Sequence, residues 1–149
     1  MRPLPALTVL LGLIAIASSC DANGQDQGSH EATHTAINEV QWGPTSFGPE
    51  ASPVSGDFSA GGHITYIRME PGTKTPLHVH SHSYIGIVVE GTMRHWLPGF
   101  PETEKDLPAG SHWSIPGNAE HVSECLDGAG CIAAVFQDNF FDFTAVDEN

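Results

Sequence analysis

The sequence predicts an all-β protein, and three observations indicate this fold class. From residue 63 onward, short runs rich in β-branched and aromatic residues follow one another. Glycine, proline, asparagine or aspartate bounds nearly every run, and no segment keeps a helical period over a useful length. Many short strands separated by turns are typical of a sandwich or a barrel. A chain of 149 residues is long enough for one such domain with its own core, so we expect a single domain.

The N-terminus, residues 1–19, has the layout of an export signal. Arg2 precedes an apolar stretch from Leu4 to Ala17, which is short for a membrane span and ends in small residues. The ending ASSC resembles the lipobox of bacterial lipoproteins, in which the cysteine, here Cys20, is acylated and becomes the first residue of the mature protein. Ala17 departs from that motif, which usually has leucine there. We expect an exported bacterial protein, in the periplasm or tethered to a membrane only through a lipid on Cys20; a plain signal peptide is the alternative.

The cysteine count supports this placement. Three cysteines leave one without a disulfide partner in an oxidising compartment, and a lipid on Cys20 accounts for it. Cys125 and Cys131 flank LDGAG, whose glycines favour a turn, so two strands meeting there would allow a disulfide. Two reduced, buried thiols are the alternative.

Composition divides the rest of the chain. Residues 20–38 have few large apolar side chains and are predicted to form a flexible tether, with His30 and His34 in solvent. The folded domain is predicted over residues 39–149, and its first part, rich in proline and glycine, is expected to be an arm with one or two short strands. The later strands are predicted at 63–69, 77–83, 84–90, 92–97, 111–116, 121–126, 131–137 and 140–146.

The charge balance excludes one class of partner. The chain has 5 Lys and Arg against 18 Asp and Glu, a formal net charge of −13. Binding to nucleic acid or to anionic lipid headgroups needs clustered cations, so neither is expected. The acidic residues are interpreted as a solvated surface.

Alternating histidines are the main chemical signal. His78 and His80 lie two apart in an extended segment, so their imidazoles point to one side, within reach of a single ion. Two ligands do not complete a metal site. Without a third ligand, the alternative to metal binding is that the two histidines lie on an exposed face of a strand. A third ligand must come from elsewhere, and the candidates are His63, His82, His95, His112 and His121.

Two spaced motifs resemble those of the cupin superfamily. In the first, Gly72 is followed after five residues by His78-Val79-His80, then Tyr84 and Gly91 at the family's spacing. In the second, Gly110 is followed after five residues by Pro116-Gly117-Asn118, and then by His121 and Cys125. The resemblance covers roughly residues 60 to 137. It implies a single cupin β-barrel, the double-stranded β-helix or jelly roll, with an N-terminal arm, and cupins commonly form homodimers.

The resemblance also implies the ligand set. His78, His80 and His121 match the histidine positions and would hold a divalent transition metal, either Fe, Zn, Ni, Cu or Mn. His82 matches a turn histidine outside the ligand set. The remaining histidines match no ligand position and are expected to be strand-face or hydrogen-bonded histidines: His63, His95 and His112.

Departures from the family motif are informative. Tyr84 replaces the usual glutamate, so the ion would keep its double charge and favour an anionic or chelating ligand. Tyr84 is interpreted as a metal ligand, as a catalytic base, or as a ring that fills the vacated space. Cys125 replaces the usual asparagine, which fits the disulfide better than a metal ligand. The segment 136–143, FQDNFFDF, resembles a narrower group of bacterial cupins without an assigned activity.

Three functions follow from the resemblance. The first is a metal-dependent enzyme acting on a small molecule, similar to three-histidine cupin dioxygenases. The second is a lipid-anchored protein that binds a metal or small ligand without turnover, and the third is a lyase that uses Tyr84 as base. An apolar lining of the pocket is also expected. Its candidate side chains are Tyr66, Met93, Trp96, Trp113 and Phe136, and the strand register determines which of them face inward.

Overall fold

The computed structural model describes residues 32–126 and 128–147. The signal peptide, Cys20 and His30 lie outside these residues. Residues from Thr35 onward belong to one compact unit. Among the described residues, no helix has the length and apolar character needed to cross a membrane.

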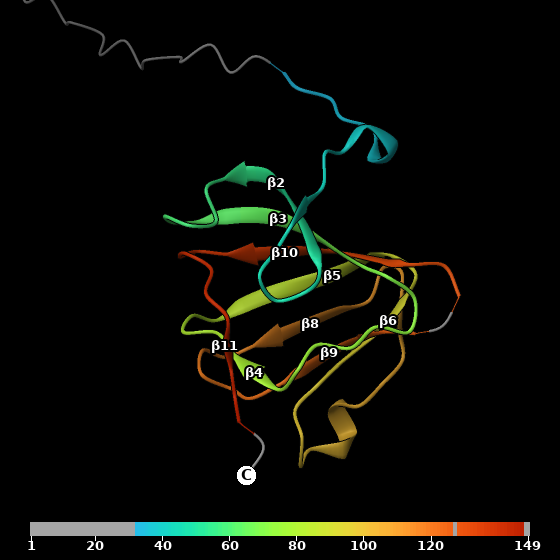
Figure 1. Cartoon of the computed structure of the whole chain (residues 1–149), viewed down its shortest axis with the longest axis vertical. Coiled ribbons are helices and arrows are strands. Elements are labelled where there is room, and N and C mark those ends of the chain that lie inside the picture. Colours follow the sequence, from blue (N-terminus) through green and yellow to red (C-terminus); the bar gives the residue numbers. More distant parts are fainter. Residues whose placement is uncertain (1–31, 127, 148–149) are drawn as a thin grey trace, which may run out of the picture. The chain divides into compact units, whose positions relative to one another are not determined.

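Nearly all of the regular secondary structure in the unit is β-strand, which confirms the predicted fold class (Figure 1). Its two helical elements are single 3₁₀ turns, η1 (Ile37–Glu39) and η2 (Pro101–Thr103). The strands are β1 (Gly43–Pro44), β2 (Glu50–Gly56), β3 (His63–Met69), β4 (His78–Val79), β5 (Tyr84–Glu90), β6 (Thr92–Trp96), β7 (Leu107–Pro108), β8 (His112–Ile115), β9 (Val122–Cys125), β10 (Cys131–Gln137) and β11 (Thr144–Ala145).

Antiparallel pairing arranges the strands in the crossed order of a jelly roll. A six-stranded sheet has the order β1-β2-β3-β10-β5-β8, and a smaller one has the order β7-β6-β9. The pair β11-β4 is linked to the smaller sheet by a bridge between His78 and His121. Since strands far apart in sequence pair directly, segments 78–80 and 121 lie side by side although about forty residues separate them.

The core lies between the inner faces of these sheets. Alternation along β5 turns Tyr84 and Val88 inward, where they meet Met93 of β6 and Val135 of β10. The opposite face of β5 leaves its isoleucines partly exposed. Cys125 is the last residue of β9 and Cys131 is the first residue of β10, in the other sheet. The two form a disulfide, with Cα atoms 5.7 Å apart.

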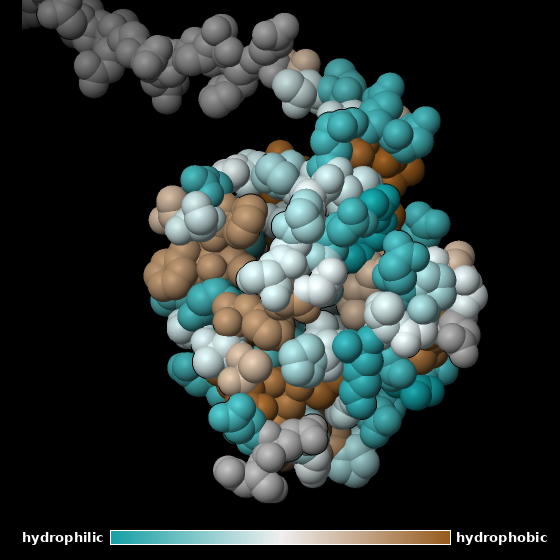
Figure 2. Space-filling view, viewed as in Figure 1, coloured by the Kyte–Doolittle hydropathy of each residue, from teal (hydrophilic) through white to brown (hydrophobic). Residues whose placement is uncertain are grey.

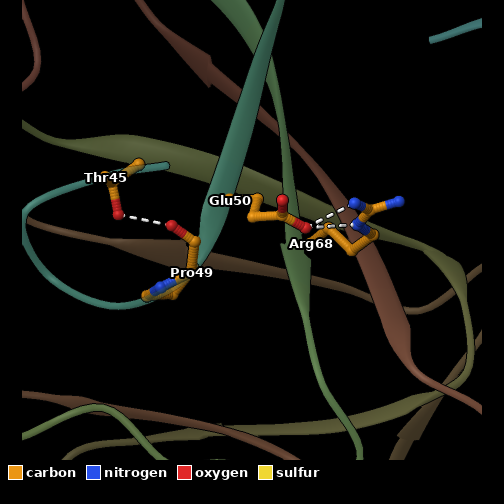
Figure 3. Close-up of polar contacts among 4 residues, drawn as sticks. All are labelled: Thr45, Pro49, Glu50 and Arg68. Carbon is orange, nitrogen blue, oxygen red and sulfur yellow. Dashed lines mark hydrogen bonds and ion pairs between the residues drawn. The ribbon is translucent and has the colours of Figure 1, made fainter. Parts of the chain in front are cut away.

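The arm packs against β3. Trp42 lies over the Arg68 guanidinium, 4.4 Å from ring centroid to Cζ, and 6.4 Å from the Tyr66 ring. Arg68 donates to the Glu50 carboxylate from Nε at 2.8 Å, and Figure 3 shows this pair beside the turn that Thr45 closes on the Pro49 carbonyl. Tyr66 therefore faces outward, away from the space between the sheets.

Candidate metal centre

Three imidazoles meet at one end of the jelly roll. The nitrogen atoms that His78, His80 and His121 offer lie within 4.8 Å of one another. All three residues are buried, and His121 is 0% exposed. The structure thus brings together the three histidines that the motif spacing singles out, and their separation allows them to share one ion.

Backbone carbonyls orient each of these rings. The Nδ1–H of His78 donates to the Pro76 carbonyl and that of His121 to the Ala119 carbonyl, both at 2.8 Å. The Nδ1–H of His80 donates to the Asp142 carbonyl. A neutral imidazole that donates from Nδ1 keeps its lone pair on Nε2. Each ring therefore presents a metal-binding atom to the common centre, and the outer hydrogen bond fixes its tautomer.

Burial keeps the cluster uncharged. Desolvation, reinforced by the neighbouring His121, lowers the pKa of His78 to about 3, and desolvation lowers the pKa of His121 to about 4. Burial also lowers the pKa of His80. Neutral imidazole is the form that binds metal, so the donor set fits a divalent transition ion at neutral pH.

Tyr84 places its hydroxyl between two imidazoles. Its oxygen lies 3.0 Å from Nε2 of His121 and 2.8 Å from Nε2 of His95. A phenol has one proton, so it donates to only one of these nitrogens at a time. Burial raises the pKa of Tyr84. The residue at the family's glutamate position is thus a neutral hydroxyl in contact with the histidine cluster.

His95 is the residue that sequence reasoning missed. We expected a strand-face or hydrogen-bonded histidine outside the ligand set, and it is hydrogen-bonded, but the prediction did not include its contact with Tyr84 or its burial, with 4% of the residue exposed. Its Nδ1 lies 2.8 Å from Oγ of Ser123, and its ring stacks on Trp113 with centroids 4.5 Å apart. Alternation along β6 carries the signal, because it puts His95 on the same inward face as Met93.

The other histidines stay outside the cluster. His63 is buried with both ring nitrogens engaged, by Thr65 at 2.9 Å and Gln137 at 3.2 Å. His82 packs edge-on against Phe140, and His112 is exposed on β8. These positions agree with their expected exclusion from the ligand set.

The C-terminal segment covers the site. Phe143 stacks on the ring of His78 with centroids 4.3 Å apart, and Phe141 lies 4.7 Å from His80. Phe47, from the arm, stacks on Phe143 in turn. β11 pairs with β4, and Figure 2 shows hydrophobic side chains gathered in the region where Figure 1 places these two strands. Phe47, Phe141 and Phe143 therefore line the cavity together with the histidines.

A cavity of about 50 Å³ lies beneath the cover. Of the five side chains expected to line a pocket, Met93 and Trp113 do so. The other three do not: Tyr66 faces the arm, Phe136 is on the outer face of β10, and Trp96 lies under Lys74. The apolar part of the lining is completed by Ile67, Met69, Ala133 and Val135.

One backbone feature departs from the cupin motif without disturbing it. Asn118 stands where the Pro-x-Gly turn has its glycine, and it adopts φ +63°, in the left-handed region that glycine favours. Asparagine tolerates this conformation better than most residues. Asn118 therefore supplies the left-handed residue of the turn before His121.

Comparison with known proteins supports the fold. The polyketide cyclase RemF from Streptomyces resistomycificus has a TM-score of 0.64 at 17% identity, over 80% of this chain and 88% of RemF. The DMSP lyase DddQ from Ruegeria pomeroyi has a TM-score of 0.56 at 20% identity, over 66% of this chain and 56% of DddQ. The complex of SigE with the anti-sigma ChrR from Rhodobacter sphaeroides has a TM-score of 0.56 at 20% identity.

At such identities these likenesses show the fold alone. The match to the SigE–ChrR complex covers 69% of this chain and 52% of the matched chain. The comparison with curated proteins finds no match. The sequence model of the ChrR cupin-like domain matches residues 30–140, most of the chain, so the protein belongs to this family of cupins.

Proposed function

We propose that this protein is a metal-dependent enzyme that acts on a small molecule through His78, His80 and His121, with Tyr84 moving a proton. One observation carries the proposal: the Tyr84 hydroxyl is hydrogen-bonded at the edge of a buried cluster of neutral imidazoles, 3.0 Å from a metal-binding nitrogen. A hydroxyl held there lies beside any ligand that reaches the ion. A bound divalent ion would polarise such a ligand and stabilise its anionic form.

The side chains of the site divide the work. His78, His80 and His121 would hold the ion, because their lone pairs face one another and their Nδ1 protons are already donated outward. Burial raises the pKa of Tyr84, so it would accept the substrate proton at its hydroxyl oxygen only after a bound cation had favoured its ionised form. His95 would fix that hydroxyl, and Phe141 and Phe143 would limit the access of water to the cavity.

Proton transfer needs no oxidant, and two structural neighbours are compatible with it. RemF is described as a cyclase and DddQ as a lyase, and both share this fold at low identity. The second candidate is a three-histidine dioxygenase, favoured by the absence of a carboxylate from the ligand set. The ChrR comparison supports a third role, in which the domain binds without turnover.

Two assays on one preparation separate these functions. The purified protein is assayed for metal content and reloaded with Zn, Mn, Ni or Fe(II). Small carboxylic acids are then incubated with it in D₂O, and solvent deuterium at carbon is followed by NMR. Oxygen uptake is measured in parallel with thiols, diketones, catechols and flavonols.

We expect metal-dependent deuterium exchange that is lost in Tyr84→Phe, which keeps its metal, and in His121→Ala, which does not. Oxygen uptake that survives Tyr84→Phe would instead establish the dioxygenase. Firm metal binding without either activity would establish the binding protein.

For its cellular place we propose export and a lipid anchor on Cys20, supported by the signal-like residues 1–19 and the odd cysteine count. Cys20→Ser should move the protein from the membrane fraction to the soluble fraction. A wild-type protein that is already soluble and unacylated would refute the anchor.

A further inference from the structure

The Trp113 indole N–H makes no hydrogen bond of normal distance and angle. In the part of the chain that the structure describes, it is the one fully buried side-chain nitrogen or oxygen left unpaired. The residue is 8% exposed, so bulk water does not reach it freely. Native proteins pair most buried polar groups, and an unpaired one calls for an explanation such as a missing ligand.

The ring cannot turn to find another acceptor. Trp113 and Gly86 are directly paired across β8 and β5, and the indole lies flat on the glycine: a Cβ at position 86 would be 2.1 Å from its Cζ2 atom. His95 stacks on the indole at an interplanar angle of 22°. The direction of the N–H is therefore set by packing.

The Trp113 side chain is part of the lining of the cavity at the metal centre. Trp113 lines the cavity together with His78, His80, Tyr84 and His95. A single buried water needs roughly 10 to 15 Å³. The cavity of about 50 Å³ is therefore larger than one water requires, and it leaves room for a small organic group.

We propose that Trp113 recognises an oxygen of the substrate and that the substrate is a small carboxylate. An indole N–H donates and cannot accept, so it selects an acceptor atom. A divalent ion held by three neutral histidines keeps its full charge, which selects an anion. The rest of the lining is largely apolar, and it fits a short carbon skeleton between the two polar ends. This inference rests on the proposed function, because it assigns the cavity to the substrate.

The oxygen of Tyr84 is the competing acceptor. It already lies within 3.0 Å of His121 and 2.8 Å of His95, and hydrogen bonding from the Trp113 side chain opposes part of the burial-induced rise in the Tyr84 pKa. If Tyr84 were the true partner, the indole proton would respond to Tyr84→Phe and not to added carboxylate. The two acceptors are therefore separable by experiment.

The test is an NMR titration of the indole groups in the zinc-loaded protein. The chain has three tryptophans, so Trp113→Phe assigns the Trp113 indole resonance, and Trp42 and Trp96 serve as internal controls. Acetate and propionate are the probes, and ethylamine, which has no acceptor oxygen, is the matched control compound. Zinc content is measured separately on every sample.

We expect acetate to shift the Trp113 indole proton downfield in a saturable manner, with Trp42 and Trp96 unchanged and ethylamine without effect. Replacing Trp113 alone with 3-benzothienylalanine keeps the ring shape and removes the N–H, and it should weaken acetate binding about tenfold at unchanged zinc content. An indole resonance that acetate leaves unmoved in zinc-loaded protein overturns the inference. Failure to bind zinc overturns the proposed function instead.

Discussion

Adding one methyl group to Gly86 tests how tightly the candidate site is packed. In Gly86→Ala the new Cβ would lie 2.1 Å from the Trp113 ring, whereas ordinary contact begins at 3.4 Å, so the ring has to retreat by about 1.3 Å. The indole is rigid, buried and stacked on His95, and it has no free end that can yield. Overpacking of this kind costs roughly 1 to 3 kcal/mol.

The loss of unfolded-chain entropy in Gly86→Ala opposes this destabilisation but is smaller. Replacing glycine by alanine restricts the unfolded chain and stabilises a protein by about 0.4 to 1 kcal/mol when the folded backbone tolerates the change. Gly86 lies in β5, and its φ is outside the left-handed region, so this gain applies. The net expectation is a loss of about 1 to 2 kcal/mol in the free energy of unfolding.

Gly61→Ala is the matched control. Its new Cβ would meet no atom within 4 Å, and its backbone is also outside the left-handed region. The control should be as stable as the wild type or slightly more stable, because it gains the entropic effect without the clash. Both variants are compared by urea unfolding of metal-free protein.

The displacement of the Trp113 ring in Gly86→Ala should also lower the affinity of the site for zinc. A shifted Trp113 moves His95, which fixes the hydroxyl of Tyr84 beside His121. We expect zinc affinity, measured by chelator competition, to fall about tenfold in Gly86→Ala and to stay unchanged in Gly61→Ala. Equal stability and equal zinc affinity in the two variants would refute the packing argument.

Three further perturbations test the disulfide, the histidine cluster and the cover. Replacing both Cys125 and Cys131 by serine should lower the free energy of unfolding by about 2 kcal/mol, since the bridge closes a short loop; an unchanged urea midpoint would contradict this. In metal-free protein the native pKa values of His78, about 3, and His121, about 4, lie below the unfolded value. Stability should therefore fall between pH 6.5 and 4, by about 1.4 kcal/mol per pH unit for each histidine, and a flat profile would refute the shifts. Phe143→Ala should speed zinc extraction by EDTA severalfold, whereas an unchanged rate would mean that the C-terminal segment does not limit access.

The fold could be predicted because its signals are local. Glycine and proline mark the turns, and alternation in segments such as HITYIRM determines the face of each residue. The extents of β4 and β11 could not be predicted. Both were expected to be longer strands, but only two residues of each pair, where the chain end meets the ligand strand. That meeting is a contact between residues about 65 apart, which no local pattern records.

The site was predictable where a motif fixes spacing and unpredictable where register decides. His78, His80 and His121 follow from the cupin pattern. For His95, alternation along β6 predicts only the inward face, and its role also depends on β6 pairing with β9 in the register that sets it beside Ser123. The aromatic cover was missed for the same reason: 140–146 was predicted as a strand, but its sequence does not show what it packs on.

The arrangement as a whole favours a metal over a proton in the centre. The three Nδ1–H groups are already donated to carbonyls, so His78, His80 and His121 turn three Nε2 lone pairs inward, and the one on His121 is in hydrogen-bond contact with the Tyr84 hydroxyl. A proton on any of them would place a charge in a buried site with no carboxylate in the ligand set, which is why their pKa values fall. A divalent ion satisfies all three lone pairs at once. Substitution of tyrosine for the family's acid therefore leaves the ion's charge to be balanced by the ligand, and an anionic substrate is the natural counterpart of this site.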